Sequence, residues 1–224
     1  MRVRALARFR LRGAVAGRSL VAPVIALVLV QLLGLAGPRA PAAISLASAI
    51  SFALPVLAWS VRQVLDAEPG DQVHLSTLAV GGPVREVVAG LLAAYAVAAT
   101  LAVSCAGASL LRADHAGVPV RDAAAGFALA LATALVAVAV GGLAARAVAG
   151  TGGASVVVLV AAPVLIAVVG LSGNPAVTAL VPRLDATVRA AYAGHLATEA
   201  PALLAQIVLW SAVVLGLRLL RRLR

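Results

Sequence analysis

Six long runs of apolar residues, separated by segments that carry nearly all of the charge, constrain what this chain can fold into. They cover residues 20–36, 42–61, 84–110, 123–145, 154–171 and 202–217. A helix needs about 17–25 apolar residues to cross the hydrocarbon core of a bilayer. Because 63% of the 224 residues are apolar and only 12% are charged, the sequence predicts an all-α membrane protein with six transmembrane helices.

The basic residues, which are all arginine, set the predicted orientation. With the N-terminus inside, thirteen of the 18 arginines lie on the cytoplasmic side and five lie outside. Cytoplasmic segments are the ones that carry excess basic charge, so both termini are predicted to be cytoplasmic. The alternative is a cleaved signal peptide ending near "PRAPAA", which would leave five spans. The long apolar run and the crowding of Pro38 and Pro41 favour a retained first span.

The first 19 residues form a separate basic segment, predicted to be an interfacial helix. Arg4, Arg8 and Arg12 recur every four residues, so they share one face of a helix. Arg2 and Arg10 do not fall on that face, which makes the amphipathic pattern imperfect. A disordered basic tail is the alternative interpretation. Residues 20–224 then form the transmembrane domain.

A polar loop at residues 62–83 joins the second and third runs. Pro69 and Gly70 break the preceding helix. We expect Asp71 to cap a short helix over residues 72–80, which Gly81 ends. Pro83 suits the first turn of the third span. Within the short helix, Val73 and Leu78 are expected to bury one side, while His74, Ser76 and Thr77 stay polar.

Residue types that are missing exclude several activities. The chain contains no lysine, so it cannot supply the phosphate-binding lysine of a P-loop ATPase. The apolar runs hold essentially no ionisable residue, whereas ion-coupled carriers need such groups within their spans. His195 has no cysteine or second histidine at metal-ligand spacing, so no metal site is expected.

Mild polar residues inside the spans are candidates for a substrate path. Ser45, Ser48 and Ser51 step by three along the second run, and Tyr95 lies within the third. They either line a path or bond to neighbouring helices, and the second interpretation is favoured. Outside the membrane, residues 172–201 form a long external segment, in which residues 182–199 are predicted to be helical.

Taken together, this layout resembles a known family. A basic N-terminal segment precedes six spans, a cytoplasmic loop contains a short helix, and "LAVGGPVREVVAGLLAAYAV" leads into the third span. A long external segment separates the last two spans. The chain is therefore similar to permease subunits of type-2 ABC exporters from high-GC, actinobacteria-like bacteria. The resemblance implies an ABC-2 permease fold in the bacterial inner (cytoplasmic) membrane.

The resemblance also implies partners and contacts. Two permeases, identical or different, would form the pathway, and separate ATPase subunits would hydrolyse ATP, so this chain would be no enzyme and bind no cofactor itself. No nucleic acid is expected as a partner, whereas membrane lipid is. The loop and the N-terminal helix would contact the ATPase through Asp71, His74, Ser76, Thr77, Arg85, Glu86, Arg8 and Arg12. The substrate stays open between lipid, peptide, drug and polysaccharide precursor. A scaffold or regulatory protein that moves no substrate is the alternative function.

Overall fold

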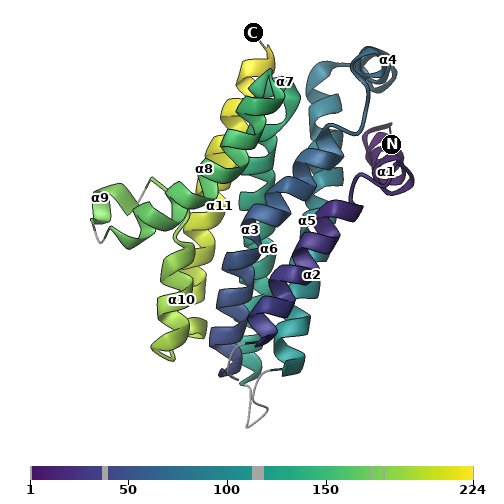
Figure 1. Cartoon of the computed structure of the whole chain (residues 1–224). Coiled ribbons are helices and arrows are strands. Elements are labelled where there is room, and N and C mark those ends of the chain that lie inside the picture. Colours follow the sequence, from purple (N-terminus) through teal and green to yellow (C-terminus); the bar gives the residue numbers. More distant parts are fainter. Residues whose placement is uncertain (1, 37–39, 113–118, 173, 179, 224) are drawn as a thin grey trace.

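The structure, a computed structural model, describes residues 2–36, 40–112, 119–172, 174–178 and 180–223 (Figure 1). Every regular element in these ranges is a helix. Five helices are long and apolar enough to cross a membrane, and α1 with α2 forms a sixth candidate span if that bent pair is counted as one. The chain is therefore a multi-pass membrane protein with five or six spans. Those five helices are α3 (Ala42–Leu65), α5 (Pro83–Arg112), α6 (Val120–Ala144), α8 (Gly152–Leu171) and α11 (Leu196–Leu223).

The predicted N-terminal helix is present, so the alternative of a disordered tail is wrong. Helix α1 (Arg2–Ala16) turns by 74° into α2 (Val21–Ala36). Arg18 lies in the corner with a φ of 56°, a left-handed conformation that non-glycine residues seldom adopt. With 16 residues, α2 is about 24 Å long at 1.5 Å per residue, which is shorter than the core of a bilayer.

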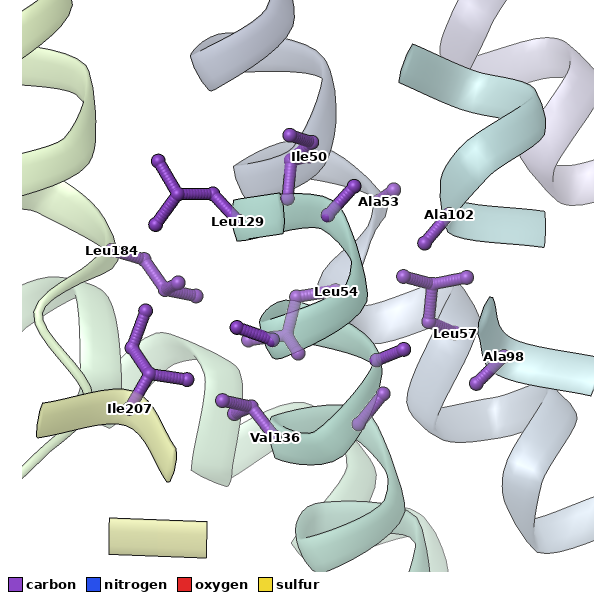
Figure 2. Close-up of a cluster of buried hydrophobic side chains, with 14 of the residues drawn as sticks. Ile50, Ala53, Leu54, Leu57, Ala98, Ala102, Leu129, Val136, Leu184 and Ile207 are labelled. Carbon is purple, nitrogen blue, oxygen red and sulfur yellow. The ribbon is translucent and has the colours of Figure 1, made fainter. Parts of the chain in front are cut away.

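Helices α3 and α6 form the centre of the bundle, with α5 and α11 packed around them. Figure 2 shows Leu54 of α3 on the side of Val136 of α6, and Leu57 of α3 beside Ala98 and Ala102 of α5 in the same cluster. Small residues let these helices approach closely, which is how membrane helices gain van der Waals contact without a hydrophobic drive. A Cβ on Gly126 of α6, for instance, would lie 2.7 Å from the Leu46 side chain.

One end of the bundle gathers α1, α4 (Gly70–Val80), α7 (Arg146–Ala149) and the last turns of α11 (Figure 1). We call it the upper end, as it is drawn. Helix α4 matches the predicted short helix, but Asp71 is not its N-cap, because the helix already begins at Gly70 and Pro69 occupies the cap position. Gly81 ends α4 in the left-handed conformation, and α5 begins at Pro83, as predicted.

The predicted external helix over residues 182–199 is wrong in its boundaries. Gly194, with a φ of 73°, separates α10 (Leu184–Tyr192) from α11, which starts at Leu196 and runs continuously through Pro201. Helix α10 packs against α3, α8 and α11, because its apolar side is buried there. Before it, α9 (Pro175–Thr178) follows α8. The indole of Trp210 donates to the Leu180 carbonyl at 2.9 Å, which fixes this connection on α11.

Helices α8 and α11 are the least enclosed of the five long helices. Helix α8 follows α7 and the cap residue Thr151, whose hydroxyl accepts from the Ala154 N–H at 3.2 Å. Most of its valines and leucines are exposed, and only Ser155, Ile166 and Gly170 are buried. In a membrane such exposed aliphatic side chains face lipid or another helix.

The close approach of α3 and α6 gives a first prediction. A Cβ on Gly141 of α6 would meet the Ala58 carbonyl oxygen and lie 2.7 Å from Val61 Cβ of α3. Gly141→Ala therefore forces the two helices apart, and we expect it to cost about 1–3 kcal/mol and lower the unfolding midpoint by several degrees. The one cysteine, Cys105, is buried, so its reaction with a thiol-reactive dye reports unfolding of the heated, detergent-solubilised chain.

Gly216→Ala is the matched control, because a Cβ there meets nothing within 4 Å and Gly216 also lies in a long apolar helix. The control should unfold at the wild-type temperature or slightly above it, since alanine favours helix. Equal midpoints for the two variants would contradict the packing described for α3 and α6.

Candidate functional site: a buried ion-pair cluster at the upper end

Helix α4 presents an apolar face outward although it lies among polar segments. Leu75 and Leu78 are 68% and 78% exposed, and His74 is exposed beside them. The expectation that Leu78 would be buried is therefore wrong, whereas Val73 is partly buried. Large apolar side chains grouped on the surface of an otherwise polar region are typical of an interaction site. We call Leu75, Leu78 and His74 the α4 surface.

Behind the α4 surface lies a buried cluster of charges. The guanidinium of Arg10, on α1, donates through Nε to Glu68 Oε2 at 2.9 Å and through Nη2 to Glu86 Oε1 at 2.5 Å. Arg10 Nη2 also contacts Glu68 Oε2, and the Ser76 hydroxyl donates to Glu68 Oε1. The side chains of Arg10, Glu68 and Glu86 are only 4%, 4% and 10% exposed. One guanidinium thus faces two carboxylates, and all three side chains are nearly out of contact with solvent.

The chain positions each member of this cluster through its local structure. Glu86 lies in the first turn of α5, where the positive end of the helix dipole favours a carboxylate. Glu68 comes one residue before Pro69, in the connection between α3 and α4. Arg10 crosses α5 at Gly90, where a Cβ would collide with its Nη1 atom. A side chain at residue 90 would therefore displace the Arg10 guanidinium from its present position.

A second contact ties the adjacent connection to the same end. The Asp66 carboxylate, at the end of α3, accepts from the backbone N–H of Arg146 at 3.0 Å. It also accepts from Arg62 Nε at 3.3 Å, and Arg146 Nε lies 3.7 Å away. Because Arg146 is the first residue of α7, Asp66 satisfies one of the free N–H groups at the start of that short helix. Helices α3 and α7 are thereby joined.

The structure brings together only some of the residues predicted to contact a partner. Ser76 and Glu86 belong to the buried cluster, and the Thr77 hydroxyl bonds within α4 to the Val73 carbonyl at 2.8 Å. His74 and Arg85 are exposed, and Arg85 Nη1 lies next to Gly81. Asp71 belongs to α4, but its side chain lies outside the described part. Arg8 and Arg12 are exposed on α1.

Sequence reasoning missed Arg10 and Glu68. The signal for Arg10 was present, since it lies among Leu6, Ala7 and Ala14 on the side of α1 opposite to the Arg4, Arg8 and Arg12 row. A charge on the apolar face of a helix needs a buried partner of opposite charge. The sequence could have shown that need, but it could not have chosen between the carboxylates available to meet it.

The candidate path residues are partly buried, and Ser51 is the one for which a bond within its own helix is found. Ser45 donates to the Ala40 carbonyl at 3.2 Å, and Ser51 donates to the Ala47 carbonyl at 2.9 Å. Ser48 is partly buried on the same helix, and the Tyr95 hydroxyl reaches the Leu131 carbonyl of α6 at 3.5 Å.

In the described part of the chain, no three His, Cys, Asp or Glu residues are grouped as a metal site would need.

Comparison with known proteins places the chain in no group. No family model matches it, and neither a curated protein nor a solved structure is similar to it.

The buried cluster gives a second prediction. Arg10→Met leaves Glu68 and Glu86 buried without their cation, a loss that costs about 3–5 kcal/mol when a buried pair is broken. We expect α1 to detach from α4 and α5, so that trypsin cuts the remaining arginines of α1 many times faster. The measurement is the rate of limited proteolysis of the purified chain, together with the midpoint of Cys105 exposure.

Arg12→Met removes the same charge and the same kind of trypsin site from the exposed side of α1. It should leave both measurements near their wild-type values. Gly90→Ala should act like Arg10→Met, because it displaces the guanidinium without changing any charge. If Arg10→Met and Arg12→Met are cut at the same rate, the cluster does not hold α1.

Proposed function

We propose that this chain is the membrane-spanning permease subunit of an ATP-driven exporter, of the type-2 ABC class, in the bacterial inner membrane. The observation that carries the proposal is the α4 surface. A short helix at the end of a membrane bundle exposes two leucines and a histidine, and a buried ion-pair cluster fixes it to α1 and α5. A partner could bind the exposed side chains of such a helix. Because the helix is fixed to α1 and α5, its movement would also move the spans.

The charge distribution supports a cytoplasmic position for this surface. Thirteen of the 18 arginines belong to the segments predicted to lie inside. The segments that carry them are α1, the end of α3, the start of α5, α7 and the end of α11, and they gather with α4 at the upper end (Figure 1). Because basic residues accumulate on the cytoplasmic side, we place the α4 surface where a soluble ATPase can reach it.

The energy source would lie outside this chain. The sequence has no lysine for a P-loop, so ATP would be hydrolysed by a separate ATPase subunit that docks on the α4 surface and Arg85. The cluster of Arg10, Glu68 and Glu86 would then hold α4 rigidly on α1 and α5. Movement of α4 would reach Glu68 through Ser76, then α1 through Arg10 and α5 through Glu86. It would reach α2 through the junction of α2 with α1.

The substrate path would form between two permeases, either two copies of this chain or this chain and a paralogue. The exposed aliphatic side chains of α2 and α8 provide surfaces on which a second bundle can pack. Ser45, Ser48, Ser51 and Tyr95 are the residues that we assign to the path. The external helix α10 would cover its outer end. No residue assigned here specifies the substrate.

The third prediction tests the α4 surface. Leu75→Ser with Leu78→Ser removes its exposed apolar side chains without touching the buried cluster. We expect the tagged wild-type chain, extracted from its native membrane, to co-purify with ATPase activity. The double variant should lose most of that activity, because hydrophobic contact at the centre of an interface supplies much of the binding energy. Arg85→Glu should weaken it as well.

Leu111→Ser is the control, since Leu111 is 81% exposed at the far end of α5. This variant should keep the ATPase. A wild-type chain that never carries ATPase activity would refute the exporter. If it carried instead a partner that hydrolyses no ATP, and lost it in the double variant, the scaffold function would take its place.

A further inference from the structure

We propose that Arg4, Arg8, Arg12 and Arg18 bind the phosphate groups of anionic phospholipids and hold α1 on the membrane surface. We call these four residues the arginine row. The proposal concerns the side of α1 that faces away from the buried cluster. It does not depend on the exporter function, because it would hold for any role of the α4 surface.

The arginine row is exposed and lacks acidic partners within the described part of the chain. All four side chains are exposed, while Arg10, Ala7 and Ala14 on the opposite side of α1 are buried. The ion pairs found among the described residues use Arg10, Arg62, Arg146 and Arg189, and none uses the row. Like charges four residues apart repel one another on a helix, so a bound anion would relieve that repulsion.

The position of α1 places the arginine row at the depth of lipid headgroups. Helix α2 is about 24 Å long and a bilayer core is about 30 Å thick, so with Ala36 at one edge of the core Val21 lies near the other. The 74° bend then turns α1 away from the direction of α2, and Arg18 lies in the corner between them. The exposed aliphatic side chains of α2 suit the apolar core of a bilayer, and α1 continues from the end of that helix.

Apolar side chains beside the arginine row distinguish a lipid surface from an acidic protein. Val15 is 68% exposed among these arginines, and Phe9 is 59% exposed at the flank of the row. Helices that lie in the membrane interface combine basic residues with exposed phenylalanine or leucine, because the apolar groups enter the acyl boundary while the cations meet phosphates. Basic residues near an anionic surface each contribute about 1 kcal/mol of attraction.

The test uses the full chain in a neutral detergent, titrated with phosphatidylglycerol, while Cys105 reports the unfolding midpoint. We expect phosphatidylglycerol to raise the midpoint, and phosphatidylcholine or soluble glycerol phosphate at the same phosphate concentration to leave it unchanged. The variant Arg4→Gln with Arg8→Gln and Arg12→Gln should need at least about tenfold more phosphatidylglycerol for half of the shift. Salt at about 1 M should weaken the wild-type response, since it shortens the Debye length to about 3 Å.

Two control variants separate this surface from net charge and from misfolding. Changing the same three arginines to lysine keeps the charge and should keep the response, because an ammonium group also binds phosphate. Arg121→Gln removes an exposed arginine from the opposite end of the bundle and should respond like the wild type. If the glutamine variant responds like the wild type, or if soluble glycerol phosphate reproduces the shift, the proposal is wrong. It is also wrong if that variant keeps the lipid response and loses a co-purifying protein, which would make the row a protein-docking face.

Discussion

The buried contact of Arg10 with Glu68 and Glu86 determines how the upper end of this protein is arranged. The Arg10 guanidinium donates to carboxylates from two different segments, Glu68 and Glu86. The Ser76 hydroxyl of α4 also donates to the Glu68 carboxylate. Because these side chains are removed from solvent, loss of Arg10 would leave two carboxylates buried without a cation. Helices α1, α4 and α5 are therefore held as one unit at the edge of the bundle.

The bundle below is held by a different kind of force. Helices α3 and α6 meet through glycine and alanine, and Gly141 lies so close to α3 that no Cβ fits. Dispersion contacts of this kind are short-ranged and depend on shape, which makes the centre intolerant of added volume. The upper end is held by ion pairs and the centre is closely packed. A displacement of α4 would therefore move α1 and α5 together instead of being absorbed by loose packing.

The polar loop shows which structural features local sequence signals predict and which they do not. The breakers Pro69, Gly81 and Pro83 placed α4 and the start of α5 correctly, because each acts on its own backbone conformation. The predicted cap at Asp71 and the predicted burial of Leu78 were wrong. Pro69 had already started the helix, and the buried side of α4 was chosen by its contacts with α1 and α5. Arg10 was passed over for the same reason, since its partners lie 58 and 76 residues away.

The sequence by itself determined that the chain crosses a membrane, where most of its helices lie, and which segments carry the charge. Those properties follow from the length and hydrophobicity of single segments. The thickness of the bilayer sets the length of a span, and the absence of water in its core favours helices. Only the tertiary structure decided that α1 bends by 74° against α2, that α10 packs into the bundle, and that Arg10 of α1 is buried. These features depend on contacts between segments that are far apart in the sequence. The apolar pattern of one helix does not specify which other helix packs against it.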